Sequence, residues 1–366
     1  MTTKHALPAA FDPDAAALAA SGIYGLPFKP KDARVVIVPV PFEATTSYGG
    51  GASKGPAAVL EASKQVDLFD HETGRPYAAG IAMLDIPKSV LRWNREAKAL
   101  AHAKRPATKK VNAYGERVNQ WVYEQTRALL DAKKMPVILG GDHSVPFGAI
   151  RAYAERYPGL GILHLDAHAD LRDAYEGFTW SHASIFHNVM TKIDAVGRLV
   201  QVGVRDLGQA ERAMIDGSNG RIVTFYDADL AARKEDGVPF ATIADEIAAA
   251  LPRDVYLSWD IDGLDPTLCP GTGTPVPGGL SWNEAIGLLR ALVRAKKRIA
   301  GLDLCEVSPG ETEWDANVGA RLLYKMIGFA LLTHGTPISN RPVRRLPVGA
   351  ERSSADRPTR SRRSVR

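Results

Sequence analysis

Short apolar runs rich in Val, Ile and Leu recur along the chain, and each has the length of a buried strand. The runs cover 34–40, 80–84, 136–140, 160–166, 199–204, 221–225, 254–260 and 298–305. Between them, amphipathic segments at 118–134, 241–252 and 282–297 place apolar residues near helical spacing. Because strand and helix alternate, the pattern predicts an α/β protein whose mostly parallel sheet of about eight strands is covered by helices on both faces.

The same pattern predicts a single domain. No internal repeat and no linker interrupts the middle of the chain, and we interpret the polar, basic segment at 91–110 as a surface excursion rather than a boundary. We therefore expect an Ala-rich N-terminal arm over 1–33, one domain over 34–336 and a separate tail over 337–366.

The composition favours a soluble, cytoplasmic protein. The 366 residues are 45% hydrophobic, which is ordinary for a globular chain. The two cysteines, Cys269 and Cys305, provide no disulfide framework, so a reducing compartment fits best. The N-terminus lacks a secretory signal, and no apolar run approaches the ~20 residues of a membrane span.

The net charge of +5 belongs to the tail. Residues 341–366 hold nine Arg against Glu351 and Asp356, a local charge of +7, which leaves −2 for the preceding residues. Nucleic-acid binding is therefore not expected of the domain. The tail is poor in apolar residues, and we interpret it as disordered and solvated in preference to a site for RNA, anionic lipid or a partner.

Ionisable residues follow four of the apolar runs, at the point where each strand is expected to end. They are Asp142 and His143, the motif DAHAD at 166–170, the acids Asp260, Asp262 and Asp265, and Glu306. Because ligands of open α/β sheets collect at the carboxyl ends of the strands, we expect these residues to converge on one site.

The motif DAHAD predicts a metal centre. Asp166, His168 and Asp170 occupy alternate positions, so on an extended chain their side chains point the same way, about 7 Å apart per step. Carboxylates this close repel one another unless cations lie between them. Two divalent cations balance four carboxylates, and the candidate ligands are His143, Asp166, His168, Asp170, Asp260 and Asp262. Mostly oxygen ligands with two imidazoles favour Mn²⁺, with Ni²⁺, Co²⁺ or Zn²⁺ as alternatives.

Five motifs in this order resemble the ureohydrolases, the arginase and agmatinase group, over about residues 34–335. They are GGDHS, DAHAD, SWDIDGLDP, GTGTPVPGGL and DLCEVSP. The resemblance implies a three-layer α/β/α arginase-like fold, two Mn²⁺ per subunit, and hydrolysis of a guanidino group to urea and an amine. It also implies a homo-oligomer, either a trimer or a hexamer.

The resemblance further implies a role for each matching residue. Asp166 and Asp260 correspond to the carboxylates that bridge the cations. His143 and Asp170 complete one ion, and His168 and Asp262 complete the other. His182 matches the family's proton-shuttle histidine, which we expect to titrate near neutrality. Glu306 matches the acid that holds the substrate's guanidinium, and Asp170 doubles as a proton relay.

Plainer interpretations remain for some of these residues. His182 can be a solvent-facing histidine at a helix start, and Glu306 can be a partner in a buried salt bridge. His164 shares the strand face of Asp166, and the sequence does not decide between a supporting role beside that ligand and core packing. Neither cysteine has a base partner in the sequence, so we assign no nucleophile.

The predicted substrate is a small guanidino compound, and agmatine fits best. Arginases carry a stretch like RDVDPGE for the amino-acid head of their substrate, whereas this chain reads RDLGQAE at 205–211, with Gly208 in place of the second Asp. The loop after DAHAD offers Arg172, Asp173 and Glu176, and the two acids can meet a distal ammonium. Cleavage of agmatine to putrescine and urea would belong to polyamine metabolism. 4-Guanidinobutyrate, which Arg172 would favour, free guanidine and arginine are the alternatives.

Two further alternatives differ in class. Histone-deacetylase-like enzymes share this architecture but typically use one zinc and tandem histidines, and no HH pair occurs here. A catalytically silent ureohydrolase-like subunit is the other alternative, since the family includes partners that assemble without turnover, and intact ligands disfavour it. All six, together with His182 and Glu306, are present.

Overall fold

The computed structural model describes residues 7, 11–46 and 48–335. Its eight strands form one parallel sheet, as the apolar runs predict. The strands are β1 (Val35–Val40), β2 (Ile81–Met83), β3 (Met135–Gly140), β4 (Leu160–Leu165), β5 (Val196–Val204), β6 (Ile222–Tyr226), β7 (Asp254–Asp260) and β8 (Arg298–Cys305). Their order in the sheet is β2-β1-β3-β8-β7-β4-β5-β6.

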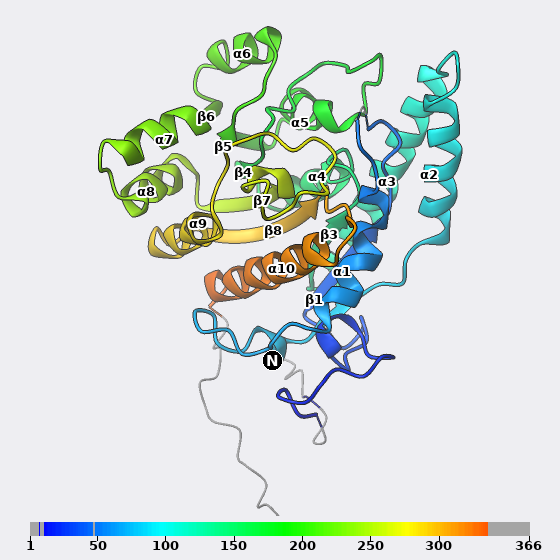
Figure 1. Ribbon diagram of the computed structural model, residues 1–366, viewed down its shortest axis with the longest axis vertical. Coiled ribbons are helices and arrows are strands. Elements are labelled where there is room, and N and C mark those ends of the chain that lie inside the picture. The colour runs from blue at the N-terminus through cyan, green and yellow to red at the C-terminus, as the bar shows by residue number, and fades with distance from the viewer. Residues whose placement is uncertain (1–6, 8–10, 47, 336–366) are drawn as a thin grey trace, which may run out of the picture.

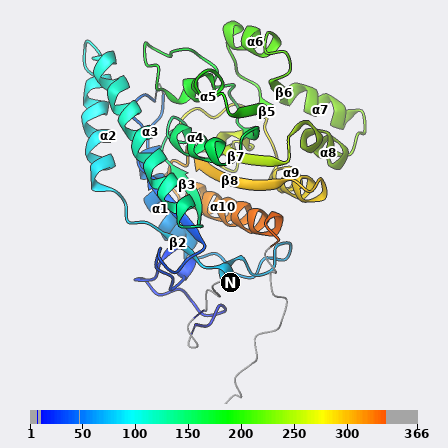
Figure 2. The ribbon, with the colours of Figure 1, turned by 180° about the vertical axis from the view of Figure 1, so that it is seen from behind.

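Ten α-helices of the described chain cover both faces of the sheet. They are α1 (Gly55–Ser63), α2 (Lys88–Ala101), α3 (Thr108–Asp131), α4 (Phe147–Arg156), α5 (Ile185–Lys192), α6 (Gln209–Asp216), α7 (Asp227–Glu235), α8 (Phe240–Ala250), α9 (Trp282–Arg294) and α10 (Trp314–Thr333). Figures 1 and 2 show α9 and α10 on one side of the sheet and α4 and α5 on the other. The three-layer α/β/α arrangement is therefore confirmed.

Most positions in the strands are apolar because both faces of the sheet are buried. In β7, Val255, Leu257 and Trp259 pack in the core under α8–α10, whereas Tyr256 packs in the core under α2–α5. Alternate side chains point to opposite faces. The polar side chain of Ser258 therefore faces the α2–α5 layer.

The register of the sheet brings the ionisable motifs together. Leu165 pairs with Trp259, so Asp166 and Asp260 follow on adjacent strands, and Asp260 itself pairs with Cys305, immediately before Glu306. GGDHS follows β3, which pairs with β8. The expected convergence at the carboxyl edge is thus a consequence of strand order.

The basic segment at 91–110 and the predicted N-terminal arm both pack against the rest of the domain. Most of 91–110 is helical, and α2 packs beside α3 within the domain. In the predicted arm, Ile23 and Tyr24 are buried against the domain, and the Tyr24 hydroxyl donates to the Ala320 carbonyl at 3.1 Å. The predicted tail lies outside the described residues. No helix in the described part of the chain is long and apolar enough to cross a membrane.

Candidate metal centre

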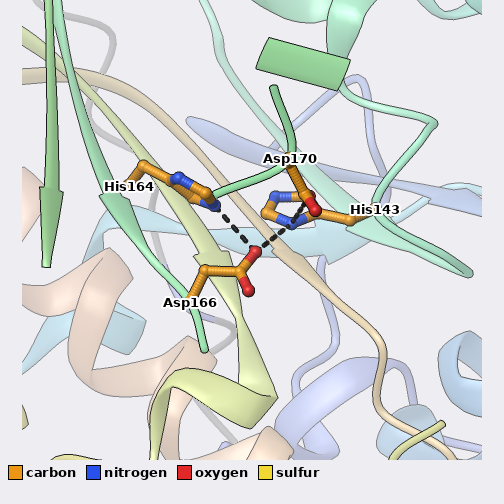
Figure 3. A group of neighbouring side chains, drawn as sticks. All are labelled: His143, His164, Asp166 and Asp170. Carbon is orange, nitrogen blue, oxygen red and sulfur yellow. Dashed lines mark hydrogen bonds and ion pairs between the residues drawn. The ribbon is translucent and has the colours of Figure 1, made fainter. Parts of the chain in front are cut away.

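All six predicted ligands meet at the carboxyl edge of β3, β4 and β7. The Nδ1 atom of His143 lies 3.0 Å from Oδ2 of Asp166, 3.5 Å from Oδ2 of Asp170 and 3.4 Å from Oδ2 of Asp260. On the other side, Nδ1 of His168 lies 3.4 Å from Oδ1 of Asp166 and 3.1 Å from Oδ2 of Asp262. Asp166 therefore presents Oδ2 to His143 and Oδ1 to His168. Figure 3 shows Asp166 between His143 and His164, with Asp170 nearby.

The DAHAD motif reaches this geometry through a turn rather than an extended strand. β4 ends at Leu165, and Asp170 adopts a left-handed conformation with φ 54°. The carbonyl of Asp170 accepts hydrogen bonds from the N–H groups of Phe186 and His187 at the start of α5. These bonds hold the strained residue in place.

Three of the carboxylates accept a hydrogen bond from a backbone N–H group, and Asp166 accepts that of His168. Oδ1 of Asp260 accepts from the N–H of Asp262 at 2.9 Å, and Oδ1 of Asp262 accepts from the N–H of Ala167 at 3.0 Å. In both residues the second oxygen is left facing a histidine Nδ1. Asp265, in the same motif, instead binds the N–H and hydroxyl of Thr267 and takes no part in the cluster.

The electrostatics of the cluster fit a pair of divalent cations. Burial, followed by the charge of Asp166, raises the pKa of Asp170 well above its usual value, and burial with Asp262 does the same for Asp260. Burial opposes ionisation of Asp166 as well, but His164 and His143 lower its pKa overall. Buried carboxylates that resist ionisation beside one another are stabilised as anions by metal ions. Hard oxygen atoms with two imidazoles form a suitable donor set.

Ser258 and Asp303 support the His143 ring on the side away from the other predicted ligands. Neither residue was selected from the sequence. Nε2 of His143 lies 3.0 Å from Oγ of Ser258, whose hydroxyl donates to the Asp303 carboxylate. Ser258 must then accept from the Nε2–H group, which leaves the Nδ1 lone pair directed at the cluster. A polar residue within each of two apolar runs, DVYLSWD and RIAGLDLC, was the available signal.

Glu306 lies beside the cluster, on the chain just after β8. Its Oε1 accepts from the backbone N–H of His143 at 3.0 Å, and its side chain is buried. Burial, followed by Asp260 and Asp142, raises its pKa well above the usual value. No basic side chain among the described residues forms an ion pair with it, which argues against the salt-bridge interpretation.

His182 lies in the wall of a cavity next to the cluster. It begins a short 3-10 helix (His182–Ser184), and its Nδ1 is buried with no hydrogen-bond partner. Burial, followed by the charge of His168, lowers its pKa to about 4. This pKa is below the near-neutral one expected from the sequence, because the cavity wall keeps most of the side chain from water.

The cavity has a volume of about 430 Å³ and runs from the cluster toward the surface. Its lining includes His168, Asp170 and His182, together with Arg172, Asp206 and Glu211. Asp173 and Glu176 are not among the lining residues. The Asp173 side chain is 88% exposed and lies 3.7 Å from Nδ1 of His187.

Asp206 is the acidic wall residue that sequence analysis did not select. Glu211 is engaged elsewhere: it accepts from the N–H groups of Leu171 and Gly208, and Arg172 Nε lies 3.5 Å from its Oε2. The Arg172 guanidinium also lies over the Tyr175 ring, 5.1 Å from its centroid. No ion pair involves Asp206 in the described chain, so its carboxylate adds a negative charge to the cavity wall that Arg172 and Glu211 do not offset.

The chain is similar in sequence and in fold to proteins of one known family. The sequence pattern described as Arginase family matches residues 33–328. The chain is 36% identical over 306 residues to N(1)-aminopropylagmatine ureohydrolase of Thermus thermophilus, covering 83% of this chain and 93% of that protein. It is 30% identical over 281 residues to agmatinase of Bacillus cereus, covering 76% and 85%. The crystal structure of agmatine ureohydrolase of Thermoplasma volcanium has the same fold, with a TM-score of 0.69 at 24% identity over 87% of this chain and 97% of that one.

Proposed function

Because the chain belongs to the arginase family, and is thus a ureohydrolase that cleaves C–N bonds, we propose that it hydrolyses agmatine to putrescine and urea. The observation that carries this proposal is a cavity lined both by residues of the His/Asp cluster and by the carboxylate of Asp206, which has no ion-pair partner among the described residues. The guanidinium of agmatine would meet the cluster, and its ammonium would meet that carboxylate.

The proposed cofactor is a pair of Mn²⁺ ions. His143, Asp166, Asp170 and Asp260 would hold one ion, and Asp166, His168, Asp260 and Asp262 would hold the other. When bound, two such cations lower the pKa of water and fix the direction of its attack on the guanidino carbon.

The protein's own residues position the substrate and move protons. Glu306 lies beside the cluster, where its carboxylate would orient the planar guanidinium. Asp170 faces both the cluster and the cavity, so it can accept a proton and pass it toward the leaving nitrogen. His182, in the cavity wall, would exchange that proton with solvent.

The charge of the cavity favours a cationic distal group. Arg172 and Glu211 offset each other, and Asp206 remains. This arrangement weakens the case for 4-guanidinobutyrate, because Arg172 already has a carboxylate partner. N(1)-aminopropylagmatine is a second candidate, since the relative of that name shares 36% of its sequence with this chain.

Urea release from a panel of guanidines tests the proposal. The Mn²⁺-loaded protein is assayed with agmatine, N(1)-aminopropylagmatine, arginine, 4-guanidinobutyrate and guanidine. We expect kcat/KM for one of the first two to exceed that for arginine at least tenfold. Arginine exceeding both tenfold would overturn the substrate, and no urea from any compound, with two Mn²⁺ bound, would point to the silent subunit.

The assembly and location remain predictions. We propose a homo-oligomer, a trimer or a hexamer, in the cytoplasm. Light scattering coupled to size-exclusion chromatography of the full chain measures the first, and fractionation of the native host measures the second.

A further inference from the structure

A row of polar side chains crosses the sheet directly beneath the metal centre. The strand register pairs Thr224 with Gln201, Gln201 with His164, His164 with Ser258, and Ser258 with Asp303. Apart from Thr224, which is partly buried, these side chains are fully buried. Buried polar groups in a sheet core are unfavourable unless they are hydrogen-bonded. Hydrophobic packing therefore does not explain why polar residues occupy these buried positions.

The orientation of the Gln201 amide follows from its neighbours. Its Nε2 lies 2.7 Å from the Ala169 carbonyl oxygen, which can only accept, so the atom there must be the NH₂ group. Its Oε1 lies 3.0 Å from the Thr224 hydroxyl, which donates to it. The second N–H of Gln201 is then directed at Nδ1 of His164, 3.0 Å away.

This amide in turn determines the tautomer of His164. A nitrogen that accepts from Gln201 carries no proton, so the neutral ring bears its proton on Nε2. Nε2 lies 2.7 Å from Oδ2 of Asp166 and donates to it (Figure 3). A doubly protonated ring would place two donors against each other at Nδ1.

We propose that His164, with its tautomer set by Gln201, is a positioning residue that orients the shared carboxylate Asp166 and is not itself a metal ligand. Neither of its nitrogens has a free lone pair, although one of them lies within 4.8 Å of ligand atoms of His143, Asp166 and Asp170. Its Nε2–H group donates to Oδ2 of Asp166, and the backbone N–H of His168 donates to Oδ1 at 2.6 Å. The plane of the carboxylate is therefore set before cations arrive. The proposal rests on the proposed metal centre but not on turnover.

The tautomer is measured directly in the full chain by ¹⁵N NMR of histidine-labelled protein without metal. We expect His164 to show a protonated Nε2 and an unprotonated Nδ1. In the Gln201→Met variant, which removes both N–H donors at similar length, this preference should weaken. A wild-type ring protonated at Nδ1 would overturn the proposal, whatever the enzyme does with guanidines.

Metal affinity gives the second test. His164→Phe keeps a ring but removes the donor, and His164→Gln keeps an N–H near the position of Nε2. We expect Mn²⁺ binding, measured by calorimetry, to weaken roughly ten- to hundredfold in His164→Phe, and His164→Gln to recover most of it. His334→Phe is the matched control, because His334 instead binds the Ile299 carbonyl.

Two results would overturn the positioning role. One is a His164→Phe variant that is folded by circular dichroism and binds Mn²⁺ as tightly as the wild type. The other is electron spin-echo spectroscopy of the Mn²⁺ protein that detects three coordinated imidazole nitrogens, since His143 and His168 account for two. If His164→Phe does not fold, the NMR and spin-echo measurements on the wild type still decide.

Discussion

Nε2 of His143 lies 3.0 Å from Oγ of Ser258, and that hydroxyl lies within 3.1 Å of both carboxylate oxygens of Asp303. The chain of donors has one direction, because the serine hydroxyl has a single proton and Asp303 accepts it. The imidazole is thereby turned so that Nδ1 faces three aspartates.

Replacing Ser258 tests this support. Ser258→Ala leaves His143 in place but removes the acceptor for its Nε2–H, so the ring can turn or change tautomer. We expect Mn²⁺ affinity to fall about ten- to hundredfold, measured by calorimetry. Ser218→Ala, after α6, is the matched control. Unchanged affinity in Ser258→Ala would show that the ring needs no such partner.

Metal binding should stabilise the fold. The cations relieve repulsion among buried carboxylates, and a ligand that binds only the native state adds about 2.7 kcal/mol at one hundred times its Kd. We expect Tm to rise with Mn²⁺ and to return after chelation. Asp262→Asn should lose most of this rise, whereas Asp265→Asn, which changes an acid of the same motif outside the cluster, should keep it. A Tm insensitive to Mn²⁺ would contradict the assignment.

Asp206 should select the distal ammonium of the substrate. Its carboxylate lines the cavity without a basic partner in the described structure. We expect Asp206→Asn to raise KM for agmatine by about tenfold, the effect of losing a charge-assisted contact of ~1.4 kcal/mol, with little change for free guanidine. Asp173→Asn is the control, since that exposed side chain lies outside the cavity. Equal effects in the two variants would refute the assignment.

Arg205 should hold the cavity wall against the metal-binding turn. Its guanidinium donates to the carbonyls of Asp262, Leu264 and Val276, and Val276 lines the cavity. Because each buried carbonyl left unpaired costs about 1–3 kcal/mol, we expect Arg205→Met to lower the free energy of unfolding by at least ~2 kcal/mol and to raise KM.

The control for Arg205 is Arg212→Met. That exposed side chain forms an ion pair with Asp216 one turn away and lies over the Tyr226 ring, so the change should stay within about 1 kcal/mol. Urea denaturation measures both variants. An Arg205→Met protein as stable as the control would show that the carbonyls find other partners.

An ion cluster far from the metal centre should make stability depend on acid pH. Lys325 Nζ lies 2.7 Å from Asp70 and 2.9 Å from Glu72, which also pairs with Arg290. Burial raises the pKa of Asp70, but its hydrogen bonds from Lys325 and Thr73 outweigh burial and lower it overall. The unfolded chain therefore binds protons first, so this stabilisation is complete above the unfolded pKa of about 4 and is lost as pH falls through the lower folded pKa.

Lys325→Met removes the shared cation of this cluster. We expect it to lower the free energy of unfolding by about 1–3 kcal/mol at pH 7, and by less near pH 3, because that pH lies below the unfolded pKa of about 4 and the stabilisation is already being lost there. Urea denaturation at the two pH values checks this. A difference that is the same at both would rule out the acids as its source.

The sequence by itself determined the layers and the residues that meet at the carboxyl edge of the sheet. Strands buried on both faces are mostly apolar, so the eight runs were visible without a structure. The residues that end them, from His143 to Asp262, were identifiable because ligand spacing is local. That parallel strands place these ends at one edge is a general property of such sheets.

Only the tertiary structure decided which residues support and surround the ligands. Asp206 and Asp173 are both loop acids in the sequence, and the path of the backbone alone puts the first in the cavity and the second in solvent. His164 could have been a packed histidine, until strand register set Gln201 beside it. Register and loop path are fixed by contacts between distant segments, and no local spacing encodes them.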